Sequence, residues 1–81
     1  MEKEILKELQ KVIKNYCSVS TEQITSKCNL RKDLGIDSFD VVCIVFDIEK
    51  KFSLSFTENE VDQIKTVDDA IKLIIAKKEN L

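Results

Sequence analysis

The spacing of apolar residues at both ends of the chain constrains the fold more than any other feature. Near the start, one apolar stripe contains Ile5, Leu6, Leu9, Val12, Ile13 and Tyr16. Near the end, a second stripe contains Val67, Ala70, Ile71, Ile74 and Ile75, followed by Lys77 and Lys78. Both have the period of one helix face, and cations suit a helix C-terminus. The stripes predict two amphipathic helices that must bury their apolar faces against other elements.

The segment from Asp37 to about Lys51 predicts a further helix. Asp37 is a good N-cap, and Gly35, which is the only glycine, comes just before it. Periodicity alone would also permit a strand from Val41 to Phe46, but the cap, the length and the later charged residues favour a helix. Because it is apolar on most faces, this helix either lies centrally in the core or keeps a surface for a partner.

Shorter elements complete the prediction. The stretch 17–35 is polar and irregular and predicts a long loop with one helical turn near 21–24. After the connector "SLSF", the letters "TENE" form a capping box with Thr57 as N-cap and Glu60 at the third helical position, opening a short helix. With 81 residues there is one domain, 1–81, and we expect an all-α fold: a small four-helix bundle of three main helices and one short helix.

Several function classes are disfavoured by composition. There is no histidine, which removes the commonest general base and metal ligand, and a core this small has no room for a deep catalytic pocket. Hence we predict neither an enzyme nor a metal site. Cys17, Cys28 and Cys43 are odd in number and widely spaced, so reduced, small buried side chains are expected rather than a disulfide scaffold. No apolar run is long enough to span a membrane and no signal peptide is visible, so we expect a cytoplasmic monomer.

Charge is distributed unevenly along the chain. Up to Lys32 there are seven basic and four acidic residues, whereas the stretch from Asp33 to Asp69 has three basic and ten acidic. An acidic stretch repels nucleic acid and favours partners with basic surfaces. The plainer alternative is a solvated face that only keeps the protein soluble.

The segment "DLGIDSFD" places Ser38 at the first turn of the predicted helix, between Asp37 and Asp40. First-turn amides have no partner within a helix, and their partial positive charge favours a phosphate. Ser38 is therefore well placed to carry a phosphodiester. It is poorly placed to be a nucleophile, because no histidine can activate it and two carboxylates disfavour its alkoxide. Taken alone, the motif favours a serine that merely starts a helix beside an N-cap aspartate.

The wider segment "RKDLGIDSFDVVCIVFDIEKKF" resembles the D-S-L segment of acyl carrier proteins, in which the serine receives 4′-phosphopantetheine from coenzyme A. The similarity extends from about Ile5 to Ile75. It implies that Ser38 is the attachment site, that the arm carries acyl groups as thioesters, and that the protein presents them without doing chemistry. The implied partners are a phosphopantetheinyl transferase (holo-ACP synthase) and acyl-transferring or acyl-modifying enzymes with basic docking patches. The implied recognition residues are Asp37, Asp40, Glu49, Glu58 and Asp62.

The sequence departs from the family pattern on the recognition helix. Phe39 replaces the usual leucine, Cys43 replaces a typical acidic residue, and Lys50 and Lys51 interrupt the acidic run. These changes favour a dedicated carrier in a specialised pathway over housekeeping fatty-acid synthesis. Carriers of amino acids, of the D-alanyl or peptidyl type, remain an alternative, as does a helical module that binds partners without any covalent group.

Two further expectations concern apolar residues. The candidates to line an acyl-chain cavity between the helices are Phe39, Val42, Phe46, Ile64, Val67 and Ile71, with an ordinary core as the alternative. If Val41 and Cys43 face solvent, they form an apolar patch beside Ser38 that would let hydrophobic contact, rather than charge, decide partner choice.

Overall fold

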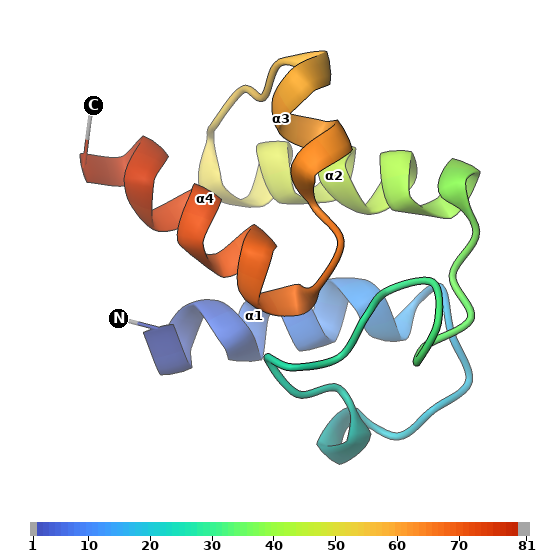
Figure 1. Ribbon diagram of the computed structural model, residues 1–81. Helices are drawn as coiled ribbons and strands as arrows, with labels where there is room; N and C mark the ends of the chain where they lie inside the picture. The colour runs from blue at the N-terminus through green and yellow to red at the C-terminus, as the bar shows by residue number, and fades with distance from the viewer. Residues whose placement is uncertain (1, 80–81) are drawn as a thin grey trace.

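The structure, a computed structural model, describes residues 2–79 and contains four α-helices in that range (Figure 1). They are α1 (Glu2–Lys14), α2 (Ser38–Phe52), α3 (Glu58–Gln63) and α4 (Val67–Glu79), with a 3-10 turn, η1 (Thr21–Gln23), in the long first loop. Within residues 2–79 there is no β-strand, only an isolated β-bridge between Asn29 and Thr66. The predicted all-α four-helix bundle, with one short helix, is confirmed.

Local chemistry explains where the helices begin and end. The Asp37 side chain accepts a hydrogen bond of 2.8 Å from the Asp40 amide, so α2 starts at Ser38. It ends at Ser53, whose left-handed backbone, with φ of +56°, forms the cap. At α3, Thr57 and Glu60 make the predicted reciprocal capping box. Helix α1 stops at Lys14, so Tyr16 lies just beyond it.

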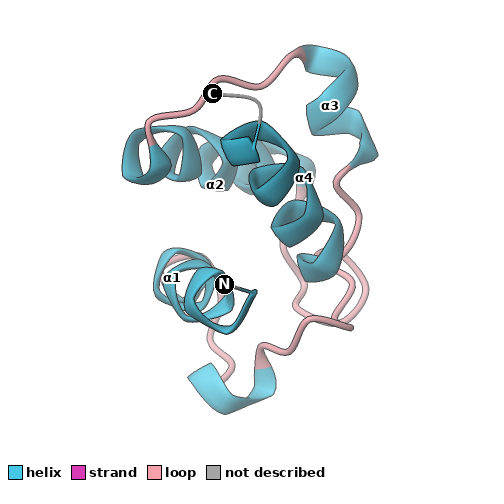
Figure 2. Cartoon of the chain, turned by 90° about the vertical axis from the view of Figure 1, so that its left-hand side faces the viewer, coloured by secondary structure: helices cyan, strands magenta, loops and turns pink. Residues whose placement is uncertain are grey.

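The core lies between α1, α2 and α4, with α3 at one edge (Figure 2). Its most deeply buried large side chains come from these three helices and from the first loop: Leu9, Ile13, Ile24, Ile36, Ile48, Val67 and Ile74. No polar or charged residue is buried among the described positions. The three cysteines are free, as expected, but only half-buried. The prediction of buried side chains is therefore wrong: Cys17 and Cys28 pack against the margin of the core, and Cys43 lies outside it.

The long first loop is held to the α3–α4 junction by backbone hydrogen bonds. Leu30 donates its amide to the Lys65 carbonyl at 3.0 Å, and Val67 donates to the Cys28 carbonyl at 3.0 Å. Gly35 has a left-handed backbone with φ of +67°, a conformation that few other residues tolerate, where the loop turns toward α2. Residues far apart in the sequence therefore meet beside the start of α2.

No helix among residues 2–79 has the length and apolar character needed to cross a membrane.

Candidate attachment and docking site

Ser38 is exposed at the first position of α2, a helix of 15 residues. Asp37 uses its carboxylate to cap the helix, as its hydrogen bond to the Asp40 amide shows. The hydroxyl of Ser38 is thus accessible at the positive end of a helix dipole, where a phosphate is favoured. A serine in this place can accept a phosphodiester-linked group without disturbing the core.

A hollow lies beside Ser38, between the first loop, α2 and α3. It is lined by Asn29, Arg31, Lys32, Ser38, Val41, Val42, Val61, Asp62, Ile64 and Lys65. Its apolar lining comes from α2 and from the end of α3, whereas its cations come from the loop and from the α3–α4 junction. The hollow adjoins the serine directly, so a flexible group attached there has both an apolar and a charged surface within reach.

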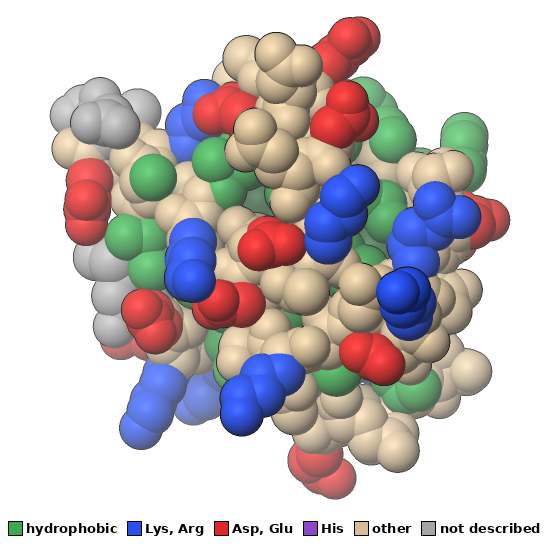
Figure 3. Space-filling model, viewed as in Figure 1, with side chains coloured by type: hydrophobic (Ala, Val, Ile, Leu, Met, Phe, Trp, Pro, Cys, Tyr) green, Lys and Arg blue, Asp and Glu red, His purple; other side chains and the backbone are tan. Residues whose placement is uncertain are grey.

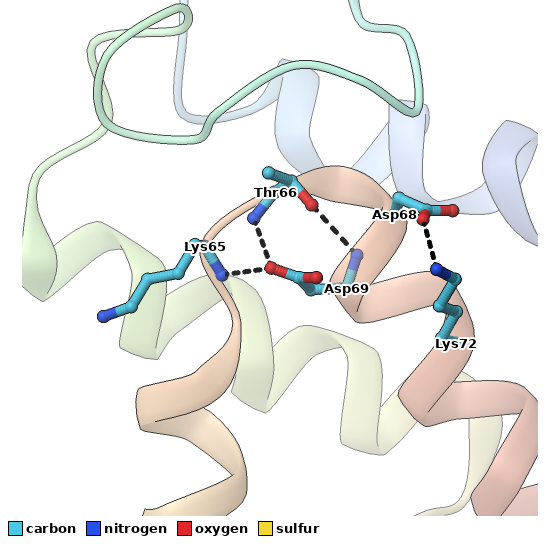
Figure 4. Close-up of polar contacts among 5 residues, drawn as sticks. All are labelled: Lys65, Thr66, Asp68, Asp69 and Lys72. Carbon is cyan, nitrogen blue, oxygen red and sulfur yellow. Dashed lines mark hydrogen bonds and ion pairs between the residues drawn. The ribbon is translucent and has the colours of Figure 1, made fainter.

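Asp69 orders the junction that carries Lys65 (Figure 4). One oxygen of its carboxylate accepts hydrogen bonds from the backbone amides of Lys65 and Thr66, each at 3.0 Å. Burial alone would raise the pKa of this carboxyl, but the two backbone hydrogen bonds outweigh it and lower the pKa below the ordinary value of 3.8. The charged form of Asp69 therefore stabilises the turn into α4.

The outer face of α2 exposes an apolar stripe, which we define as Phe39, Val42 and Phe46. Their side chains are 74%, 41% and 58% exposed, respectively. Val41, by contrast, is only 8% exposed and belongs to the core, and Cys43 is half-buried. The hypothesis of a patch made by Val41 and Cys43 is wrong, because the turn of the helix points the next residue, Val42, outward instead.

The five carboxylates predicted to recognise partners differ in exposure and in the hydrogen bonds that they make. Glu58 and Asp62 on α3 are exposed, and Asp62 also lines the hollow. Asp40 is half-buried, and Asp37 is exposed but engaged in the cap. Glu49 is half-buried and accepts the Phe56 amide at 2.8 Å, so it holds the connector between α2 and α3.

The predicted cavity residues divide into three groups. Ile64 and Val42 line the hollow beside Ser38, while Val42 and Phe46 line an adjoining groove between α2 and α3. Val67 and Ile71 are packed in the core at 0% and 3% exposure. Phe39 points into solvent, so its prediction as a cavity residue is wrong in this structure. The two hollows share Val42, Val61 and Asp62, so the groove adjoins the hollow beside Ser38.

Sequence reasoning missed a polar contact on the inner side of α2. The Tyr16 hydroxyl donates to the Asp47 carboxylate at 2.6 Å, joining the end of α1 to α2. This hydrogen bond, together with burial and the negative charge of the carboxylate, raises the pKa of Tyr16 to about 12. The apolar spacing had placed Tyr16 on a helical stripe, and nothing in the spacing indicated its polar partner 31 residues away.

Within residues 2–79 no cluster of three or more cysteine, aspartate or glutamate side chains is arranged to hold a metal ion. The surroundings of Ser38 consist of its own hydroxyl, an apolar surface, three cations and the single carboxylate of Asp62. These residues fit a phosphate-linked organic arm.

Comparisons of the sequence and of the structure with known proteins point to the same family. The family described as "Phosphopantetheine attachment site" matches residues 7–74. The chain is 37% identical over 75 residues to an acyl carrier protein of Coprothermobacter proteolyticus, covering 91% of this chain and 92% of the relative. It is 35% identical to an acyl carrier protein of Prochlorococcus marinus, covering 95% and 96%. A solved acyl carrier protein from Enterococcus faecalis superposes with a TM-score of 0.80 at 27% identity, covering 95% and 98%.

Proposed function

The chain belongs to the acyl carrier proteins of the phosphopantetheine attachment family, and we propose that Ser38 is the residue that receives the 4′-phosphopantetheine arm. One observation carries this proposal: an exposed serine starts a long capped helix and opens onto an apolar hollow. The arm ends in a thiol that carries acyl groups as thioesters. A phosphopantetheinyl transferase would first attach the arm to Ser38. Acyl-transferring and acyl-modifying enzymes would then act on the thioester that the arm carries.

The chain's own residues would shelter and direct the arm. Val42, Val61 and Ile64 offer an apolar surface directly beside Ser38. The path continues along Val45, Phe46 and Phe56 in the groove between α2 and α3. Apolar surface of this kind favours a hydrocarbon chain over water. With no histidine in the sequence, we expect that the protein itself does not hydrolyse thioesters faster than the solvent does.

Partner enzymes would dock on α2 and α3. The exposed stripe of Phe39, Val42 and Phe46 provides apolar contact, and Asp40, Glu58 and Asp62 provide flanking negative charge. Exposed aromatic side chains grouped on one face are typical of binding surfaces, whereas rim charges steer and orient an approaching partner. We expect apolar contact on this stripe to contribute more to docking than charge along α2 does.

Intact-protein mass spectrometry tests the attachment site. Incubation with coenzyme A and a phosphopantetheinyl transferase should add one arm to the wild type and none to Ser38→Ala. Ser55→Ala, which removes another exposed serine, is the matched control and should accept the arm fully. Addition to Ser38→Ala at the wild-type level contradicts the proposal, because the arm is then attached elsewhere. No addition to the wild type also contradicts it and favours a module that binds partners without a covalent group.

A further inference from the structure

Three cations surround the hollow beside Ser38: Arg31, Lys32 and Lys65. All three are exposed, and none makes an ion pair with another described residue. Asp62 is the sole carboxylate among the lining residues. Figure 3 shows Lys and Arg side chains over much of this face, including its right-hand part, where apolar atoms lie between them. The hollow is positive although the surrounding sequence is acidic.

The first loop orders the backbone that carries Arg31 and Lys32. The Asn29 side-chain oxygen accepts the amides of Arg31 and Lys32 at 3.0 and 2.9 Å. The Asn29 amide in turn donates to the Asp33 carboxylate at 2.7 Å. These bonds define a compact turn, so the two side chains start from a backbone that is already ordered. An anion binding there would face little cost for ordering the loop.

The third cation is brought to the same place from the other end of the chain. The Lys65 carbonyl accepts the Leu30 amide at 3.0 Å, which places Lys65 next to the turn that carries Arg31. Asp69 binds the Lys65 backbone amide, while the Lys65 side chain extends away from that carboxylate (Figure 4). The ammonium group therefore makes no ion pair with Asp69, and its charge is available to the hollow.

We propose that Arg31, Lys32 and Lys65 form an anion-binding site that holds either the phosphodiester of the arm or an acidic group at the far end of the acyl cargo. The inference rests on the proposed attachment at Ser38, which lines the same hollow. The arm is flexible, so its far end can fold back over the apolar surface and bring a carboxylate to the cations. A cargo with a free ammonium group would be repelled, which disfavours aminoacyl groups at this site.

The protection of the thioester against hydroxylamine distinguishes the phosphodiester from the cargo carboxylate as the bound anion. The holo protein is loaded with an adipoyl group or with its monomethyl ester, which have the same chain but differ in charge. The rate of thioester cleavage by hydroxylamine is compared with that of the same thioester on free pantetheine. If the cations hold the cargo, protection of adipoyl should exceed that of the ester by about threefold to tenfold at low salt, because each exposed pair contributes little and three act together. The difference should shrink as salt rises.

Charge-removing variants provide the controls. Arg31→Gln combined with Lys32→Gln and Lys65→Gln should abolish the preference for adipoyl. Lys3→Gln combined with Lys7→Gln and Lys50→Gln removes the same charge from exposed positions outside the hollow and should keep it. If circular dichroism shows that the first variant is unfolded, Lys65→Gln alone should lower the preference about twofold.

The outcomes separate the two sources of the anion and the two proposals. In one outcome, the adipoyl thioester and its monomethyl ester are protected equally, and both lose protection in the triple variant of Arg31, Lys32 and Lys65. That outcome identifies the phosphodiester as the bound anion. Equal protection that no variant changes overturns the anion site. The mass of each sample is measured first: absence of the arm contradicts attachment at Ser38, whereas protein that carries the arm but shows no effect of the cations contradicts the anion site alone.

Discussion

The two sides of the α2 N-terminus differ sharply in chemistry. On the outer face, Phe39 and Phe46 leave more than half of each aromatic side chain in solvent. On the inner side, toward the loop and α3, Arg31, Lys32 and Lys65 surround a hollow with an apolar lining. Ser38 lies at the boundary. Val42 lines the hollow and also belongs to the exposed stripe. The difference indicates a division of labour in which partners contact the exposed stripe, from Phe39 onward, and the arm enters the hollow.

The two surfaces also arise by different routes. The outer stripe is a consequence of local helix geometry: α2 buries Val41, Ile44, Val45 and Ile48, and the apolar residues left over must face outward. The cationic hollow requires long-range backbone pairing between the loop and the α3–α4 junction. A change that loosens this pairing should therefore damage the hollow and leave the stripe intact.

The largest effect is expected on the outer face. Phe39→Ala should slow transfer from a cognate enzyme about tenfold to thirtyfold in kcat/KM, because truncating an exposed aromatic anchor removes a hot-spot contact. The loss should be insensitive to salt. Phe39→Leu, which keeps an apolar side chain, should recover most of the rate. A loss that salt abolishes, or an equal loss in the Leu variant, would show that the stripe does not act by hydrophobic contact.

The next prediction removes the Asp69 carboxylate, which holds the junction between α3 and α4 beside the hollow. Asp69→Ala leaves the Lys65 and Thr66 amides without their acceptor, so the free energy of unfolding should fall by roughly 1–2 kcal/mol in denaturant titrations. Asp68→Ala, which removes only an exposed ion pair with Lys72, is the control and should cost much less.

The pH dependence of Asp69 provides a second check. Since the folded state lowers the pKa of this carboxyl below 3.8, its stabilisation is present above that pH and is lost as pH falls through the lowered value. The gap in stability between wild type and Asp69→Ala should close in acid. A gap that is constant with pH would mean that the charged carboxylate does not hold the junction.

A smaller effect is expected from the flanking carboxylates. Reversing Asp40 and Glu58 to lysine should slow cognate transfer about twofold to fivefold at low salt, and the effect should vanish at high salt because exposed charges are screened. Circular dichroism checks that the fold is retained. If this variant is impaired more than Phe39→Ala, charge rather than apolar contact dominates docking.

The last prediction concerns a contact away from both surfaces, that of α2 with the end of α1. Tyr16 is the only tyrosine and there is no tryptophan, so ultraviolet absorbance follows its ionisation directly. The midpoint should lie near 12 in the folded protein and return toward 10.0 in Asp47→Asn. Because the folded state raises this pKa, the stabilisation is complete below pH 10 and lost as pH rises toward 12. Identical midpoints would exclude the hydrogen bond in solution.

Much of the fold could be predicted because its signals are local. The caps at Asp37 and Thr57 and the apolar stripes of α1 and α4 are each contained in a few neighbouring residues. The orientation of α2 could not be predicted, because residues 41–46 are all apolar and give no contrast between faces. Only packing determines that Val41 is buried and Val42 exposed.

The candidate site was predictable in part for the same reason. Ser38 follows from the motif around it, but the cationic hollow joins Arg31 to Lys65, which the loop brings together by the Leu30 hydrogen bond. Counting charge along the chain hides this group, because Lys65 lies in the acidic stretch. The adjacent pair Arg31 and Lys32, directly before "DLGIDS", was the one local signal available.

Backbone amide chemical shifts of the apo and holo forms, measured by NMR, test the division between the two sides of Ser38 most directly. Apart from the residues adjoining Ser38 itself, attachment of the arm should shift amides along the hollow, at Arg31, Val61 and Lys65, and leave Lys50 near the far end of α2 unchanged. Shifts concentrated on the outer face, or none beyond the neighbours of Ser38, would contradict the account.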